Sequence, residues 1–269
     1  MTLLHAEAVG KVYRSGGFFG GGTARPVLTD ITLSVTAGES VALVGASGCG
    51  KSTLARLLLG LERPSSGTIR FNGHPLTTLR GPERLAYRRA VQVVFQDSLG
   101  AVNPRHRIGH TIAEPLRHLT DLTDRQRDGR VAELLALVGL SPADADKLPG
   151  QMSGGQMQRV CIARALAPRP ALIILDEAVS NLDLVMQIQV LDLLAGLRRQ
   201  LGTAFVFITH DLRLIPRLCE RVVVLDDGRI VEERTVATGL HLESAVGLRL
   251  QAATLPPRPD RSRKTAAVA

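Results

Sequence analysis

One eight-residue segment constrains the fold of this 269-residue chain more than any other feature. Residues 45–52 read Gly-Ala-Ser-Gly-Cys-Gly-Lys-Ser and fit the pattern GxxxxGK[ST], between an apolar run and a helical pattern that starts near Lys51. Glycines let such a loop turn tightly, so that backbone N–H groups and the helix N-terminus can surround phosphate oxygens. The residues expected to hold the phosphates are Gly45, Ala46, Ser47, Gly48, Cys49, Gly50, Lys51, Ser52 and Thr53.

Residue types assign different roles within this loop. Lys51 would reach the β- and γ-phosphates, and the Ser52 hydroxyl would ligate Mg²⁺. Cys49 also lies in the loop, but Cys161 and Cys219 are far away in the sequence. This spacing does not indicate a disulfide framework or a metal site, so we expect three reduced, small apolar side chains.

Short runs rich in Val and Ile alternate with helical patterns, which predicts an α/β fold with a mostly parallel sheet. The expected parallel strands are residues 40–44, 91–95, 171–175 and 204–208. Asn72-Gly73 and Asp227-Gly228 predict hairpin turns, with strands at 68–71, 222–225 and 229–232, and hence an antiparallel portion.

Residues 97–151 show helical periodicity without a convincing strand. The segment 125–140 places Val131, Leu134, Leu135 and Val138 on one helix face. We therefore expect a helical subdomain, about 97–158, inserted into the α/β core.

Two carboxylates follow the apolar run 172–175. An apolar strand ending in acids can simply reach solvent, but a phosphate loop needs one carboxylate for its metal and another to polarise water. Asp176 suits the Mg²⁺ role and Glu177 the role of general base.

A second glycine motif follows Met152 and reads Ser153-Gly154-Gly155-Gln156. Ser153 is a good N-cap for the helical pattern that follows, and the glycines would let an anion approach that helix N-terminus. The motif resembles the LSGGQ signature of ABC ATPases, with Met152 in place of Leu. The resemblance spans residues 3 to about 236. It implies a P-loop NTPase (RecA-like) core of the ABC ATPase type, with ATP and Mg²⁺.

Further roles are implied by this resemblance. The signature residues Ser153, Gly154, Gly155 and Gln156 would face the nucleotide of an opposite subunit. Gln96 resembles the glutamine that senses Mg²⁺ and the transmembrane partner, and His210 resembles the switch histidine at the γ-phosphate. Asp183 belongs to a D-loop in which Asn181 replaces the more usual Ala, and Tyr13 stands where an aromatic stacks on adenine.

Within the family, residues 96–105 and the Gly-rich insertion between 13 and 27 resemble importers for peptides and nickel. The resemblance implies a second, non-identical ATPase subunit, two transmembrane permease subunits and a periplasmic or external substrate-binding protein. It places the chain at the cytoplasmic face of the inner membrane, with nickel(II) as cargo. A dipeptide or oligopeptide importer is the alternative, although the C-terminal cysteine cluster of some peptide importers is missing.

A different class, a soluble ABC ATPase acting on nucleic acid, is suggested by the net charge of +8. The arginines are scattered and no aromatic–basic interleaving occurs, so we expect no direct nucleic-acid contact. No signal peptide and no apolar run of transmembrane length is expected. His106 and His110 could suit Ni²⁺, but Asn103-Pro104 starts a loop, so the two need not share a helix face. We expect no nickel site on this chain.

The predicted organisation is a nucleotide-binding domain over residues 1–245, followed by a C-terminal extension over 246–269. The last residues, 256–269, are basic and rich in Pro and are expected to be disordered. The Gly-rich segment 16–22 is expected to be a flexible loop.

Overall fold

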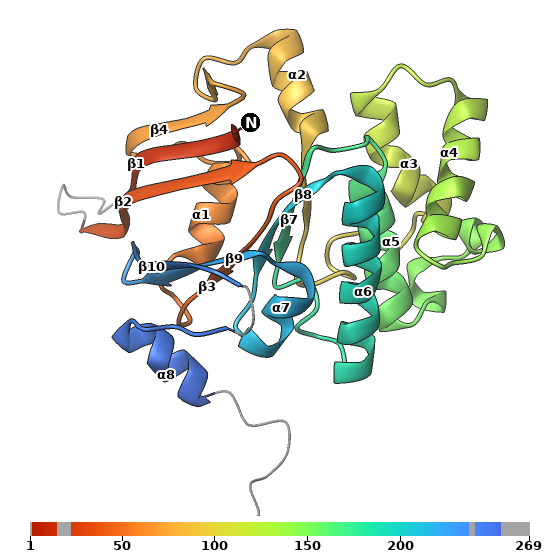
Figure 1. The fold of residues 1–269 in the computed structure, drawn as a ribbon. Coiled ribbons are helices and arrows are strands. Elements are labelled where there is room, and N and C mark those ends of the chain that lie inside the picture. The colour runs from red at the N-terminus through yellow and green to blue at the C-terminus, as the bar shows by residue number, and fades with distance from the viewer. Residues whose placement is uncertain (1, 15–22, 237–239, 254–269) are drawn as a thin grey trace, which may run out of the picture.

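The computed structural model describes residues 2–14, 23–236 and 240–253 (Figure 1). The loop 16–22 and the tail 256–269 therefore lie outside the described residues. Within the described residues, no helix combines the length and the apolar character that crossing a bilayer requires.

The centre of the fold is a six-stranded sheet in the order β10-β9-β3-β8-β7-β6. Its parallel strands are β3 (Ser40–Val44), β6 (Val91–Val94), β7 (Leu172–Asp176), β8 (Ala204–Ile208) and β9 (Arg221–Asp226). The edge strand β10 (Arg229–Thr235) runs antiparallel to β9. The four predicted parallel strands are thus confirmed, with ends that differ by no more than one residue.

A second, antiparallel sheet has the order β2-β1-β4-β5. Its strands are β1 (Thr2–Arg14), β2 (Ala24–Thr36), β4 (Ser66–Phe71) and β5 (His74–Pro75). Both predicted hairpin turns are confirmed, and all four residues of Asn72-Gly73 and Asp227-Gly228 have positive φ, as tight hairpins require. The long strands β1 and β2 were not predicted, because several register shifts interrupt their pairing and blur the alternation of apolar residues.

The helices surround the six-stranded sheet. They are α1 (Lys51–Leu58), α2 (Gly81–Ala90), α3 (Ile108–Leu119), α4 (Asp124–Leu137), α5 (Gly154–Leu166), α6 (Leu184–Leu201), α7 (Ile215–Leu218) and α8 (Ala245–Ala253). Short 3-10 turns occupy Pro142–Asp146, Pro149–Gln151 and Leu212–Leu214. The predicted boundary after residue 245 falls at the start of α8, whose Val246 packs into the main core.

Helices α3 to α5 lie together on one side of the molecule, opposite the antiparallel sheet, where the helical subdomain is predicted (Figure 1). Helix α5 continues past the predicted end at about residue 158. Thr123 begins α4 with a capping box that includes Gln126. Of the predicted apolar face, Val131, Leu134 and Leu135 are buried within α4, and Val138 is buried at its C-cap.

The strands of the central sheet are apolar on both faces because each face covers a separate core. Ile173 and Leu175 of β7 belong to the cluster under the helical subdomain, whereas Leu172 and Ile174 belong to the cluster beneath the antiparallel sheet. Since β3, β6, β7 and β8 are parallel, their carboxyl ends lie along one edge of the sheet. This edge collects the residues of the candidate site.

Candidate active site

The loop between β3 and α1 depends on glycines that lie against neighbouring backbone. A Cβ on Gly45 would come within 2.1 Å of the Leu225 carbonyl oxygen, and one on Gly50 within 3.0 Å of the Val27 carbonyl oxygen. The loop therefore closes over a pocket of about 190 Å³. The residues that line this pocket are Val27, Ser47, Gly48, Gly50, Lys51, Ser52, Thr53 and Glu177.

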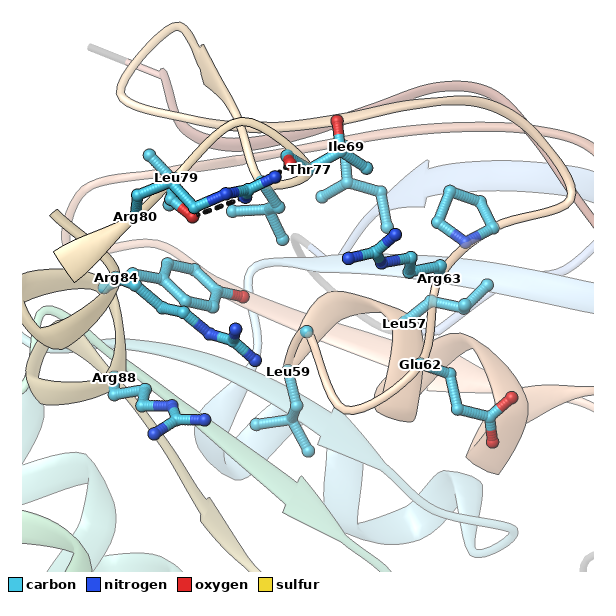
Figure 2. Close-up of a pocket in the computed structure, with 14 residues that line it drawn as sticks. Leu57, Leu59, Glu62, Arg63, Ile69, Thr77, Leu79, Arg80, Arg84 and Arg88 are labelled. Atoms are coloured by element: carbon cyan, nitrogen blue, oxygen red, sulfur yellow. Dashed lines mark hydrogen bonds between the residues drawn. The ribbon is translucent and has the colours of Figure 1, made fainter.

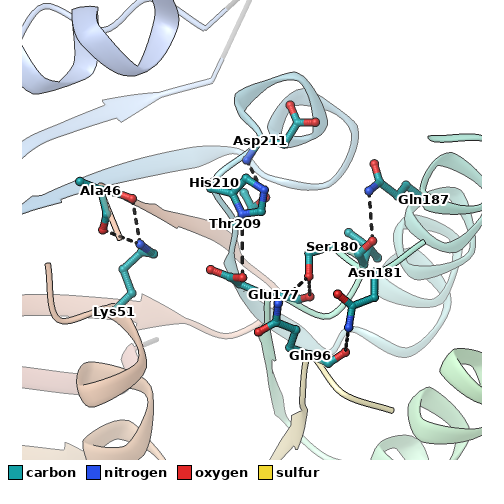
Figure 3. A network of polar contacts seen from close by, with 12 residues as sticks. Ala46, Lys51, Gln96, Glu177, Ser180, Asn181, Gln187, Thr209, His210 and Asp211 are labelled. Atoms are coloured by element: carbon teal, nitrogen blue, oxygen red, sulfur yellow. Dashed lines mark hydrogen bonds and ion pairs between the residues drawn. The ribbon is translucent and has the colours of Figure 1, made fainter. Parts of the chain in front are cut away.

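Lys51 is buried within its own loop. Its ammonium group donates to the carbonyl oxygens of Gly45, at 2.8 Å, and Ala46, at 2.9 Å (Figure 3). These two residues thus contribute backbone acceptors rather than pocket lining. The arrangement holds a cation beside the loop N–H groups, where it can meet a phosphate.

Cys49 is a structural member of the loop rather than a reactive one. Burial raises the pKa of its thiol, although the Lys51 charge opposes this, and burial likewise raises the pKa values of Cys161 and Cys219. All three cysteines are free and buried, as predicted. Each is therefore a protonated, weakly nucleophilic thiol at neutral pH.

Asp176 ends β7 at the edge of the sheet where the phosphate loop lies. Burial raises the pKa of its carboxyl group, and the neighbouring charge of Glu177 raises it further, while Arg56 and Lys51 act in the opposite direction. A divalent cation would relieve this unfavourable charge, so Asp176 and the Ser52 hydroxyl fit a hard ion such as Mg²⁺. Among the described residues, no three His, Cys, Asp or Glu side chains are grouped to hold a metal. Such an ion would therefore also need phosphate oxygens.

This pKa direction predicts the behaviour of Asp176→Asn. Because the folded chain raises the pKa, it retains the Asp176 proton at a pH where the unfolded chain has lost it, so this group's contribution to stability falls as pH rises through that window. We expect Asp176→Asn to raise the Tm of the nucleotide-free chain at neutral pH and to weaken Mg²⁺-dependent ATP binding at least about tenfold. Scanning fluorimetry should show the Tm gain shrinking as pH falls. A gain that is independent of pH would contradict the assignment.

Glu177 and His210 face each other across the pocket edge. The backbone of Glu177 has φ 49°, an unfavourable value for a non-glycine residue, and its N–H donates to the Ile208 carbonyl oxygen at 3.1 Å. His210 follows β8, and its Nδ1 lies 3.9 Å from Glu177 Oε2. The constrained turn thus aims a carboxylate into the phosphate pocket, with an imidazole beside it (Figure 3).

A chain of hydrogen bonds connects Gln96 to the turn after Glu177. Gln96 Nε2 donates to Ser180 Oγ at 3.1 Å, and Ser180 Oγ donates to the Glu177 carbonyl oxygen at 2.9 Å. Asn181 Nδ2 donates to the Gln96 carbonyl oxygen at 3.3 Å (Figure 3). Gln96 and Glu177 are therefore connected through Ser180, which directly precedes Asn181 in the predicted D-loop segment.

The second glycine motif starts α5, as predicted. Ser153 Oγ accepts from the Gln156 N–H at 3.3 Å, and Gln156 Oε1 accepts from the Ser153 N–H at 2.9 Å, forming a capping box. Gly155 packs against Met186, whereas a Cβ on Gly154 would meet nothing within 4 Å. No residue of this motif lines the phosphate pocket. The chain itself therefore supplies no steric reason for the glycine at position 154.

Asp183 has a local role. Its Oδ1 accepts from the Met186 N–H at 2.9 Å, which caps α6. This cap sets the start of α6 next to the start of α5, where Met186 touches Gly155.

Comparisons with known proteins show to which family the chain belongs. The model of the ABC transporter family matches residues 28–180. The nickel import ATP-binding protein NikE of Rhodospirillum rubrum is 60% identical, covering 96% of this chain and 93% of that protein. The chain belongs to the ABC transporter family. NikE of Brucella suis is 52% identical, with coverage of 98% of this chain and 100% of that protein.

Solved ABC structures share the fold. The ATP-binding cassette MJ0796, in a dimeric post-hydrolysis state bound to ADP and Pi, has a TM-score of 0.77 and 29% identity, covering 87% of this chain and 99% of that chain. The structure of cbiO1 from Clostridium perfringens, part of the ABC transporter complex cbiONQ, has a TM-score of 0.74 and 28% identity, covering 87% and 88%. The predicted fold class is confirmed, and the chain is an ABC ATPase that binds ATP and couples its hydrolysis to transport.

The aromatic residue that this ABC ATPase would use for adenine, Tyr13, lies on β1. Its hydroxyl donates to both oxygens of Glu62, at 3.0 and 2.8 Å, and Lys11 Nζ lies 4.9 Å from its ring centroid. Lys11 also pairs with Glu62 at 2.8 Å. Glu62 thereby holds the tyrosine at its hydroxyl, and the Lys11 ammonium group lies over its ring. Glu62 could not be selected from the sequence, because it follows α1 and is distant from Tyr13 in the chain.

Two substitutions at Tyr13 separate the contribution of ring stacking to ATP binding from that of the hydroxyl hydrogen bond. We expect Tyr13→Ala to raise the KM for ATP about tenfold with little change in kcat, because stacking of a base on an aromatic ring contributes about 1–3 kcal/mol. Tyr13→Phe, which keeps the ring but loses the contact with Glu62, should stay within about threefold of wild type, since that contact is exposed. Steady-state ATPase assays of the assembled transporter measure both values. Equal losses in the two variants would refute the stacking role.

Two histidine rings lie closer together than expected for residues at the start of a loop. The rings of His106, in the loop before α3, and His110, in its first turn, have centroids only 4.2 Å apart. The loop that starts at Asn103 therefore does not separate them. Burial lowers the pKa of His110, and so do the charges of Arg117 and His106.

Proposed function

We propose that this chain is the ATP-hydrolysing subunit of an ABC importer for nickel(II). The near full-length similarity to the nickel import proteins carries the assignment of the cargo. The meeting of the phosphate loop, Asp176, Glu177 and His210 at one edge of the sheet supports the hydrolytic role.

In the proposed reaction, Lys51 and the loop N–H groups bind the β- and γ-phosphates of ATP. Glu177 then accepts a proton from a water molecule as the water oxygen attacks the γ-phosphorus, while His210 contacts the γ-phosphate. The bond between the γ-phosphorus and the oxygen that bridges it to the β-phosphate breaks, so that ADP leaves with that oxygen and inorganic phosphate is released. Ser52, Gln96 and Asp176 would hold Mg²⁺ together with phosphate oxygens. The bound ion supplies positive charge against the charge that develops on the phosphates.

The second half of the site would come from another subunit. The α5 N-terminus, with an unobstructed Gly154, offers backbone N–H groups and the positive end of the helix dipole to an anion. Because this motif does not line the chain's own phosphate pocket, we propose that it completes the pocket of a second, non-identical ATPase subunit.

The remaining partners follow from the importer assignment. They are two transmembrane permease subunits and a periplasmic or external binding protein, with this chain held by the permease at the cytoplasmic face of the inner membrane. The hydrogen bonds from Gln96 to Ser180 and from Asn181 to Gln96 would transmit contact with the permease to the turn that carries Glu177. No direct contact with nucleic acid is expected.

Uptake measurements test the cargo. Deletion of this subunit should abolish uptake of radioactive nickel at low external concentration, and expression of the wild-type chain should restore it. Dipeptide uptake, measured in the same strains, should not change. Loss of dipeptide uptake with intact nickel uptake would instead identify a peptide importer, and no effect on either would overturn the importer assignment.

A further inference from the structure

A second pocket lies away from the phosphate loop, between the C-terminal end of α1, the β4–β5 hairpin and α2 (Figure 2). Its volume is about 70 Å³. Leu57, Ile69 and Leu79 are buried there, and Leu59 and Leu76 add further apolar surface. The pocket shares no lining residue with the phosphate pocket, because α1 begins at one of them and ends at the other.

Contacts within the chain form the wall of this pocket. Tyr87 of α2 is buried, its hydroxyl donates to the Leu58 carbonyl oxygen, and its ring packs edge-on against Phe71 at 5.2 Å. A Cβ on Gly60 would lie 3.2 Å from the Tyr87 ring, so the close approach depends on glycine there. These contacts join α2 to the end of α1 and keep the pocket open.

Three arginine side chains line this pocket beside its apolar floor. Arg63 follows α1, whereas Arg84 and Arg88 lie one turn apart on α2, and Figure 2 shows Arg63 on one side of the pocket and Arg84 and Arg88 on the other. Within the part of the chain that the structure describes, the three side chains have no hydrogen bond or ion pair. Arg80, in contrast, donates to the carbonyl oxygens of Thr77 and Leu79.

The positive charge at this pocket is not balanced by the chain. Glu62 is the one acidic residue among those that line it, and Glu62 is already paired with Lys11 and with the Tyr13 hydroxyl. Arg84 and Arg88 also repel each other across one helical turn. An anion bound between the three guanidinium groups would remove this repulsion.

We propose that this pocket binds a phosphate monoester, with its phosphate between Arg63, Arg84 and Arg88 and its organic part on the apolar floor. A phosphate monoester has three terminal oxygens, and each planar guanidinium can donate two hydrogen bonds to such a group. The small volume limits the buried organic part to a few carbon atoms. A soluble metabolite and the headgroup of phosphatidic acid share this chemistry.

A ligand bound in this pocket would fix the relative position of two elements that lead to the ATP site. Helix α1 starts at Lys51, and α2 continues directly into β6, which leads to Gln96. A ligand that links Arg63, in the loop that follows α1, with α2 would therefore stabilise the position of this loop against α2. This predicts a ligand-dependent rise in Tm.

The experiment uses the full chain loaded with Mg·ADP, so that the phosphate loop is already filled. In one arm, glycerol 3-phosphate and inorganic phosphate are titrated by calorimetry and scanning fluorimetry. In the other arm, phosphatidylcholine vesicles with and without phosphatidic acid are tested by co-sedimentation. The test variant is Arg84→Gln/Arg88→Gln, and the matched control is Arg125→Gln/Arg199→Gln, which removes the same charge from exposed positions elsewhere.

We expect saturable binding to the wild type in one arm, weakened at least about tenfold in Arg84→Gln/Arg88→Gln and unchanged in the control. The arm in which this occurs identifies the source of the phosphate. The proposal is overturned if the wild type and the test variant agree in both arms, including the case of no binding. It is also overturned if the control variant loses as much affinity as the test variant, since net charge would then explain the binding.

Discussion

Glu177→Gln should bind ATP normally but hydrolyse it at least about a hundredfold more slowly, because a positioned general base contributes about 10²–10⁴ in rate. The amide keeps the size of the side chain but cannot accept a proton from water. The backbone of this residue is held by the Ile208 carbonyl oxygen, and its side chain lines the phosphate pocket, so the substitution should not move the turn. Single-turnover hydrolysis and nucleotide binding in the assembled transporter measure the two effects separately.

A matched substitution of the same type guards against a general effect of charge removal. Glu133→Gln alters an exposed residue of α4 that pairs with Arg130 at 3.1 Å, away from the phosphate pocket. It should hydrolyse ATP at the wild-type rate. Turnover by Glu177→Gln that equals the control would remove Glu177 from the role of base.

Gly154→Asp should fold and bind ATP in its own phosphate pocket, yet reduce hydrolysis by the assembled transporter about a hundredfold or more. The new carboxylate would repel the γ-phosphate and keep it away from the backbone N–H groups at the start of α5, and losing one preorganised donor to a developing oxyanion already costs about 10²–10³ in rate. Within the chain, a Cβ at this position meets nothing, so the effect must arise across the subunit interface. Nucleotide binding by the purified chain and turnover by the complex provide the comparison.

Gly129→Asp is the matched control for this substitution. Gly129 lies on α4, and a Cβ there also meets nothing within 4 Å. The control should retain both nucleotide binding and turnover. If Gly154→Asp instead weakened ATP binding by the purified chain, the motif would act on its own nucleotide or on the fold, and the proposed contact between subunits would be wrong.

The predictions that succeeded concern features encoded over short stretches of sequence. The phosphate loop, the hairpins at Asn72-Gly73 and Asp227-Gly228, and the Ser153 cap each depend on neighbouring residues and on φ values that few residue types allow. The strand that carries Asp176 could also be predicted from the sequence, because burial on both faces makes it a continuous apolar run.

The contacts that tertiary structure alone decided join residues distant in the chain. Asn181 stands where Ala is more usual in the family, and its amide donates to the Gln96 carbonyl oxygen. Glu62 reaches the Tyr13 hydroxyl from the loop that follows α1. No local propensity encodes such pairs.

The sequence by itself therefore determined the α/β fold, the phosphate loop and the position of the two candidate carboxylates at the end of β7, because parallel strands place their carboxyl ends along one edge of the sheet. Only the tertiary structure decided that the Ser153–Gln156 motif stays outside its own phosphate pocket. It also brought Arg63, Arg84 and Arg88 over one apolar floor, because the packing of Tyr87 against Leu58 and Gly60 sets α2 against the end of α1.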